Sequence, residues 1–237
     1  MSWYARRVEH NYDVIIVGGR PAGSSLGARL GAAGLNVLIV ERATFPSGPA
    51  VSAPFLLPHA MALLDEIGAD EAQFAESTPQ LRRFVLELAD YFRVVIPFDA
   101  AVGGRNYFYT VDRQRLDTCL WRGLSRWPNV HALEDTKVVD LLRDADGGVV
   151  GVVAEDAAGQ RRELRGRAVV GADGRFSLVA RKVDAQTTES RDDMATTIYY
   201  DTWHDVARYD DEPDHIAHIH GSCDGFSFVF MPTSEGR

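Results

Sequence analysis

Glycines and a carboxylate near the N-terminus have the spacing of a dinucleotide-binding turn. Gly18 would form the tight turn after a strand, and Gly23 would let the following helix pack closely on the sheet. The N–H groups at the start of that helix would then face a pyrophosphate. Glu41, at the end of the next apolar run, could accept hydrogen bonds from ribose hydroxyls, which favours a free 2′-hydroxyl over a 2′-phosphate. The complete motif reads Gly18-Gly19-Arg20-Pro21-Ala22-Gly23.

Arg20 departs from the usual pattern, because it stands where a middle glycine normally lets the backbone approach the phosphates. Its guanidinium could pair with a phosphate, or it could be solvated beside the ligand. An ordinary turn with chance glycines is the alternative to a nucleotide site. The strand before the motif, the helix after it and Glu41 favour the nucleotide site.

Three elements must position these residues. An apolar, β-branched run at residues 12–17 predicts a buried strand. Residues 21–33 have apolar side chains at helical spacing, and Gly34 stands where a C-terminal cap glycine belongs. Residues 36–40 predict a second buried strand. Together they predict a βαβ unit.

The rest of the chain predicts a mixture of strands and helices. Residues 44–58 are expected to form a loop, and helices are expected at 58–67, at 112–125 with Asp112 as its N-cap, and from about Ser177. Residues 137–143, 149–154 and 161–167 predict a β-meander, which leads into a separate short strand at 168–171. Further strands are predicted at 81–88, 91–98, 107–111, 196–200 and 226–231, with a polar loop at 209–214.

Residues 13–23 resemble the opening of FAD-dependent oxidoreductases of the class A flavoprotein monooxygenase type, whose relatives include geranylgeranyl reductases and flavin-dependent halogenases. Residues 111–117 resemble that family's Arg-x-x-Leu-Asp helix start, and residues 169–177 resemble its Asp-Gly motif. Glu41-Arg42 resembles its ribose-binding Glu and the Arg that follows. The residues that this resemblance implies for cofactor binding are Gly18, Gly19, Arg20, Pro21, Ala22, Gly23, Glu41, Arg42, Ser52, Arg113, Asp173 and Gly174.

Each motif has an implied role in this resemblance. Arg113 would lie against the FAD, and Asp173 would help to organise the pyrophosphate region and take part in NAD(P)H use. The loop at residues 47–53 resembles a segment near the flavin, which makes Ser52 an expected contact. Taken alone, Arg113 would be a surface residue at a helix start, and Asp173-Gly174 would be a turn.

The resemblance implies an FAD enzyme that takes electrons from NADH or NADPH and hydroxylates a small, often aromatic, substrate through a C4a-hydroperoxyflavin. Because the cofactor carries such chemistry, no catalytic side chain is expected. One alternative is a flavin-dependent reductase of isoprenoid double bonds, and another is a truncated, non-catalytic nucleotide-binding chain. A halogenase is disfavoured, because the sequence lacks a Trp-x-Trp-x-Ile-Pro motif and a lysine in the loop after Glu41.

We therefore expect an α/β fold, in which a Rossmann-like FAD-binding domain with a β-meander is interleaved with a β-rich substrate domain. The FAD domain would comprise residues 9–76 and 106–184, and the substrate domain residues 77–105 and 185–237. The family's downstream Gly-Asp-Ala-x-His motif has no match after Gly174. An N-terminal portion of a longer protein is therefore expected.

The charge and composition of the chain limit the kinds of molecule that it is expected to bind. The net charge of −9 argues against nucleic acid and anionic membranes, and the first apolar run is too short to span a bilayer. Two cysteines without close spacing, Cys119 and Cys223, and no signal peptide indicate a cytoplasmic protein. The sequence leaves the oligomeric state open.

Three histidines near Cys223 are candidate metal ligands. His218 and His220 would share one face of a strand. No carboxylate has metal-like spacing from His215, His218 and His220, so the sequence favours a solvated strand face over a metal site.

Overall fold

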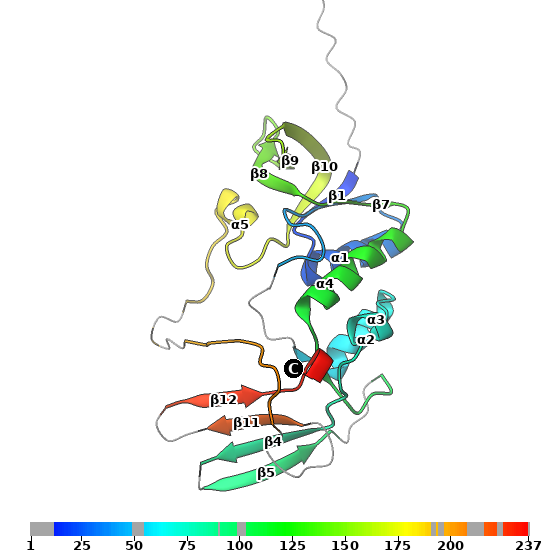
Figure 1. The fold of residues 1–237 in the computed structure, drawn as a ribbon. Coiled ribbons are helices and arrows are strands. Elements are labelled where there is room, and N and C mark those ends of the chain that lie inside the picture. Colours follow the sequence, from blue (N-terminus) through cyan, green and yellow to red (C-terminus); the bar gives the residue numbers. More distant parts are fainter. Residues whose placement is uncertain are drawn as a thin grey trace, which may run out of the picture. The chain divides into compact units, whose positions relative to one another are not determined.

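The computed structural model describes residues 12–48, 55–89, 91–98, 103–190, 193, 197–207, 216–221 and 225–236. The chain divides into two compact units (Figure 1). The first unit comprises Met1–Ser47 and Leu120–Ala195, and the second comprises Gly48–Cys119 and Thr196–Arg237.

A six-stranded sheet in the order β7-β2-β1-β10-β9-β8 forms the centre of the first unit (Figure 1). Strands β7, β2, β1 and β10 are parallel to one another, and β9 and β8 continue the sheet in antiparallel fashion. The strands are β1 (Tyr12–Val17), β2 (Val37–Val40), β7 (Val130–Leu133), β8 (Thr136–Arg143), β9 (Val149–Asp156) and β10 (Arg161–Gly171). The α/β fold and the predicted βαβ unit are therefore confirmed, whereas β7 was not predicted.

Strand β10 joins the β-meander to the parallel sheet. Its first part pairs antiparallel with β9 through Arg161–Arg165, and its second part pairs parallel with β1 from Gly166 onward. The prediction of two separate strands, 161–167 and 168–171, is wrong. Gly166 lies at the change of partner, where an added Cβ would come 2.9 Å from the Ile15 side chain. A glycine therefore permits the close approach of β1 at this point.

Helix α1 (Pro21–Ala32) packs on the parallel strands and begins with a proline, whose missing N–H costs nothing at the first helical position. The helix ends at Ala32, and Gly34 two residues later has a left-handed φ of +82° and donates its N–H to the Gly31 carbonyl. A hydrophobic core of the first unit is formed by apolar side chains of the strands and of α5 (Leu178–Lys182). Its buried members are Ile15, Val17, Leu38, Val40, Val138, Leu141, Val152 and Val179.

A four-stranded sheet in the order β12-β11-β4-β5 forms the centre of the second unit. Its strands are β4 (Arg83–Leu88), β5 (Phe92–Pro97), β11 (Ala217–Gly221) and β12 (Ser227–Phe230). A two-stranded sheet adds β3 (Phe55–Leu56) and β6 (Tyr109–Thr110). Helices α2 (Pro58–Glu66) and α3 (Glu71–Phe74) also lie in this unit. Aromatic rings dominate its core, where Phe108 stacks on Phe55 and Phe84.

Helix α4 (Arg113–Gly123) begins in the second unit and ends in the first. The Asp112 carboxylate accepts hydrogen bonds from the Gln114 and Arg115 N–H groups, which confirms the predicted N-cap. Short 3₁₀ segments follow at η1 (Leu124–Arg126) and η2 (Ser234–Gly236).

Several local expectations differ from the structure. The loop predicted at 44–58 contains β3, and α3 was not predicted. The strand predicted at 196–200 is wrong over its described residues 197–200, which form no strand and leave Tyr199 94% exposed. The polar loop predicted at 209–214 lies outside the described residues.

The units also differ from the predicted domain limits. Residues 48–76 and 106–119, expected with the FAD domain, belong to the second unit. Two contacts account for this: β6 pairs with β3, and Leu81 just before β4 bridges to Phe108. These segments therefore pack on the second sheet.

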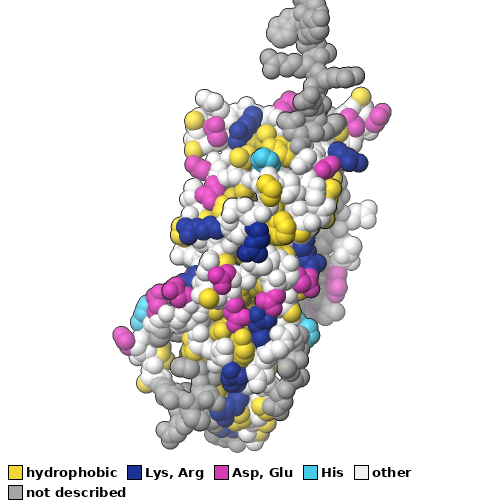
Figure 2. Space-filling view, turned by 90° about the vertical axis from the view of Figure 1, so that its right-hand side faces the viewer, with side chains coloured by type: hydrophobic (Ala, Val, Ile, Leu, Met, Phe, Trp, Pro, Cys, Tyr) yellow, Lys and Arg dark blue, Asp and Glu magenta, His cyan; other side chains and the backbone are white. Residues whose placement is uncertain are grey.

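The surface in Figure 2 carries basic side chains interspersed with acidic ones. This mixed distribution accompanies the net charge of −9. Among the described residues, no helix has the length and apolar character needed to cross a membrane.

Arg105 ties together elements of the second unit. Its guanidinium donates to the Asp65 carboxylate of α2 at 2.5 and 2.8 Å and to Glu71 of α3 at 2.5 and 3.0 Å. Glu71 also accepts from the hydroxyls of Tyr107 and Tyr109. The hydrogen bond from Arg105 holds the pKa of Asp65 below its ordinary value, and burial raises the pKa of Tyr109 to about 12.

We expect Arg105→Met to destabilise the second unit by about 1–3 kcal/mol, because it removes charged hydrogen bonds from a side chain that is only 13% exposed. Arg161→Met is the control, since that guanidinium is 66% exposed and its pair with Glu155 is worth about 0–1 kcal/mol. Urea unfolding of both variants measures the difference. Equal unfolding midpoints would show that the Arg105 network does not hold the unit together.

Candidate dinucleotide-binding site

The glycine turn follows β1, and its glycine positions lie too close to neighbouring atoms to carry side chains. Gly18 has a φ of +102°, and an added Cβ would lie 2.4 Å from the Ala172 carbonyl oxygen. A Cβ at Gly23 would lie 1.8 Å from the Gly18 carbonyl oxygen. The first and last glycines of the motif therefore have the steric roles that the sequence predicted.

The N-terminus of α1 has the properties of an anion site. Arg20 is its N-cap in an extended conformation, with φ −77° and ψ −169°, and the Arg20 side chain makes no capping hydrogen bond. Because Pro21 has no N–H, Ala22 and Gly23 provide the first backbone donors of the helix, at its positive end. Ser24 donates its hydroxyl to the Gly19 carbonyl at 2.5 Å and so fixes the turn below these donors. Arg20 itself is half-buried.

Glu41 follows directly after β2 and is only 5% exposed. One carboxylate oxygen accepts the Gly19 N–H at 2.6 Å, and the other accepts the Ala43 N–H at 2.9 Å. A carboxylate has about four acceptor positions, so Glu41 retains capacity for ribose hydroxyls. The structure thus joins Glu41 to the glycine turn through the Gly19 N–H, whereas Arg42 beside it is exposed.

An aromatic pair, which was not predicted, supports this junction. The Trp121 ring lies against Gly19, where an added Cβ would come 2.2 Å from Cζ3. Trp121 also stacks on Phe45, with ring centroids 4.9 Å apart. The sequence feature that could have indicated this inward position is the helical spacing of Trp121, which lies three residues before the inward-facing Leu124.

Asp173 and Gly174 lie immediately beyond β10, next to the glycine turn. The Ala172 N–H donates to the Val17 carbonyl at 2.8 Å. The Asp173 carboxylate accepts from the Ser177 hydroxyl at 2.5 Å and from the Leu178 N–H at 2.6 Å. Asp173 therefore caps the start of α5 while its backbone packs against Gly18.

Arg113 lies in the second unit, at the start of α4. It forms an ion pair with Asp117 one helical turn later, at 3.0 Å, and the Asp117 side chain is fully buried. The structure therefore brings together Gly18, Gly19, Gly23, Glu41 and Asp173 in the first unit. It places Arg113 in the other unit, and Ser52 lies outside the described residues.

The histidines near the C-terminus differ from expectation. His218 is only 3% exposed, so the interpretation of a solvated strand face is wrong for this residue. The carboxylate of Glu87 lies 3.2 Å from its Nε2. Sequence spacing could not reveal this neighbour, because pairing of β11 with β4 brings together residues 131 positions apart. His215 lies outside the described residues.

Residues 11–236 match the protein family described as FAD binding domain, so the chain belongs to this family. It is 31% identical over 182 residues to 3-(3-hydroxy-phenyl)propionate/3-hydroxycinnamic acid hydroxylase of Paraburkholderia xenovorans, covering 73% of this chain and 27% of that protein. It is 30% identical over 241 residues to digeranylgeranylglycerophospholipid reductase 1 of Methanopyrus kandleri, covering 95% and 56%. The predicted family and its cofactor, FAD, are confirmed.

Solved structures share the fold. The myxobacterial chondrochloren halogenase CndH aligns with a TM-score of 0.75 at 22% identity, over 94% of this chain and 50% of that one. This likeness concerns the fold alone. The chain spans 27% and 56% of the lengths of the two curated relatives.

Proposed function

We propose that this chain forms the FAD-binding portion of an NADH- or NADPH-dependent monooxygenase that hydroxylates a small aromatic molecule. The observation that carries the proposal is the junction of Glu41 with the glycine turn. There a buried carboxylate lies beside a helix N-terminus that has no side-chain cap. The two features fit the adenosine ribose and the pyrophosphate of FAD.

Each residue has a distinct part in this proposal. Gly18 and Gly23 let the backbone approach the pyrophosphate, and the Ala22 and Gly23 N–H groups bind it. Glu41 accepts the ribose hydroxyls and holds the Gly19 amide in place. Asp173 positions the loop beside Gly18. Arg113, Arg42 and Ser52 are proposed FAD contacts on the basis of the family motifs.

Bound FAD would supply the redox chemistry, namely acceptance of a hydride from NADH or NADPH and oxygen activation through the expected C4a-hydroperoxyflavin. The aromatic substrate is proposed from the relatives, because the P. xenovorans protein hydroxylates phenolic acids according to its name. A second relative named as a 6-methylpretetramide 4-monooxygenase, from Streptomyces rimosus, is 32% identical over 167 residues.

Reduction of an isoprenoid double bond is a second candidate function. It is favoured by one observation: the match to the M. kandleri reductase extends over 95% of this chain, whereas the match to the P. xenovorans hydroxylase covers 73%.

Oxygen consumption distinguishes the two candidates. The FAD-loaded protein is supplied with NADH or NADPH and with hydroxyphenylpropionate as the probe. A monooxygenase consumes oxygen and adds one oxygen atom to the probe, as measured by mass spectrometry. A protein that reduces a geranylgeranyl lipid without oxygen, and leaves the phenolic probe unchanged, would support the reductase instead.

A further inference from the structure

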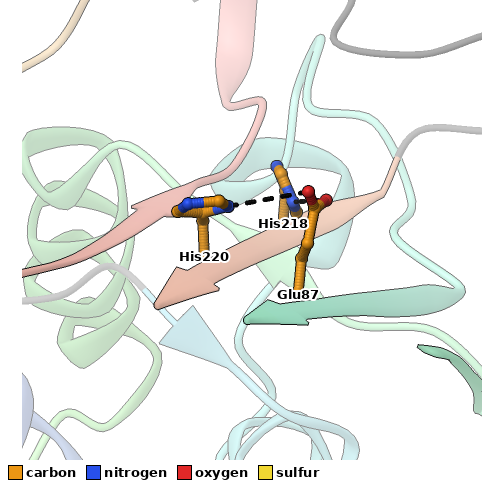
Figure 3. A group of neighbouring side chains, drawn as sticks. All are labelled: Glu87, His218 and His220. Atoms are coloured by element: carbon orange, nitrogen blue, oxygen red, sulfur yellow. Dashed lines mark hydrogen bonds and ion pairs between the residues drawn. The ribbon is translucent and has the colours of Figure 1, made fainter. Parts of the chain in front are cut away.

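Glu87, His218 and His220 form a compact cluster in the second unit. Strands β4 and β11 are parallel neighbours, with His220 opposite Glu87 and His218 opposite Val85. Residues two apart on a strand share a face, so all three side chains project from one face of the sheet. Figure 3 shows both imidazoles next to the Glu87 carboxylate. The sheet pairing therefore assembles the cluster without help from a loop.

The distances within the cluster suit a shared metal ion. His218 Nε2 lies 3.2 Å from Glu87 Oε2, and His220 Nδ1 lies 3.8 Å from Glu87 Oε1. One ligand atom from each residue lies within 4.8 Å of the other two. Ligands bound at about 2.0–2.2 Å in a tetrahedral site are separated by roughly 3.3–3.6 Å. Small side-chain rotations would bring all three atoms to that spacing.

The three side chains of the cluster differ in how much of their surface is exposed to solvent. The His218 side chain is 4% exposed and that of Glu87 is 16% exposed, whereas His220 is 28% exposed. The protein would thus fix two ligands firmly and leave a further coordination position open to water. Three protein ligands with one open position are typical of zinc sites that bind a water or substrate molecule.

We propose that Glu87, His218 and His220 bind one divalent transition-metal ion of the zinc class, through two imidazole nitrogens and one carboxylate. Imidazole nitrogens favour zinc and neighbouring transition metals, whereas magnesium and calcium prefer oxygen ligands. This site is separate from the FAD site in residues, since it lies wholly on β4 and β11. It does not depend on the proposed monooxygenase activity.

A hydrogen-bonded cluster without metal is the competing explanation. Glu87 would then accept from both imidazoles. The separation of 3.2 Å to His218 is compatible with such a bond, but 3.8 Å to His220 is too long for one. Without metal, the contact with His220 would be an ion pair rather than a hydrogen bond, and zinc binding distinguishes the two explanations.

The test is a zinc titration of the purified, tag-free chain after removal of metals with a chelator. We expect one zinc ion per chain by calorimetry and metal analysis. His218→Ala, His220→Ala and Glu87→Gln should each weaken zinc binding by about tenfold or more, because loss of a residue that only supports a metal ligand already costs about 10–100-fold. His204→Ala is the matched control, because His204 is an exposed histidine of the same unit and should leave zinc affinity unchanged.

Two further measurements keep the test decisive if a histidine variant folds poorly. Glu87→Gln preserves side-chain size and one oxygen acceptor, and urea unfolding without zinc reports whether the second unit, which contains the cluster, remains folded in each variant. Cobalt substituted for zinc gives a visible spectrum that should disappear in the ligand variants. The proposal is overturned if the wild-type chain binds no zinc, or if the three ligand variants bind it as tightly as the wild type.

Discussion

Gly23→Ala is expected to abolish measurable FAD binding. An added Cβ would lie 1.8 Å from the Gly18 carbonyl oxygen, which is backbone and cannot rotate away. Either the start of α1 or the Gly18 turn must move, and both hold the proposed pyrophosphate site. We expect FAD affinity to fall by more than about 100-fold, equivalent to roughly 2.7 kcal/mol, as measured by quenching of flavin fluorescence.

Gly123→Ala is the matched control for this substitution. Gly123 is also a helical glycine, but it is exposed and a Cβ there would meet nothing within 4 Å. Alanine at such a site favours the helix by about 1 kcal/mol, so FAD affinity should not fall. Thermal unfolding without FAD shows whether Gly23→Ala remains folded. A folded Gly23→Ala variant with wild-type FAD affinity would refute the assignment of the turn.

Glu41→Ala should weaken FAD binding by about 10- to 100-fold, the range expected when charged hydrogen bonds worth roughly 1.5–3 kcal/mol are lost. The substitution removes the proposed ribose acceptor together with the acceptor for the Gly19 and Ala43 N–H groups. Glu134→Ala is the control, because Glu134 also accepts from a backbone N–H of this segment, that of Phe45, at 3.3 Å. Equal FAD affinities of the two variants would contradict the assignment of Glu41 as the ribose acceptor.

Comparison with FMN separates ribose binding from a purely structural role of Glu41. FMN lacks the adenosine that Glu41 is proposed to bind, so the wild-type chain should prefer FAD. Glu41→Ala should lose most of that preference, and Glu41→Gln, which retains one oxygen acceptor, should be intermediate. A purely structural role would instead lower the affinity for both flavins and leave their ratio unchanged.

The part of the fold that depends on local pattern was predictable from the sequence. Strand β1, helix α1 and strand β2 have clear apolar periodicity, a proline at the helix start and Gly34 at its end. Strand β7 was missed because Val130–Leu133 is short and interrupted by His131. The continuity of β10 was missed because only the pairing partners, and not the residues themselves, show that one strand serves both halves of the sheet.

The candidate site was predictable where residue type alone defines the role. The glycines and Glu41 could be predicted as neighbours because such a turn requires small residues and a carboxylate at the end of the next strand is the expected ribose acceptor; the structure brings them together. Trp121 was missed, since its contact with Gly19 depends on how α4 packs. Glu87 was missed because β4 and β11 become neighbours only in the folded sheet. Both contacts depend on which helices and strands lie side by side in the folded chain, and the residue types alone do not show this.

Titration of the purified chain with FAD, followed by visible absorbance, tests the central claim most directly. The claim is that the turn at Gly18 to Gly23 together with Glu41 holds the adenosine diphosphate half of FAD. We predict saturable binding of one FAD per chain with shifted flavin bands, and competition by ADP. A folded chain that leaves the FAD spectrum unchanged at every concentration would contradict the account.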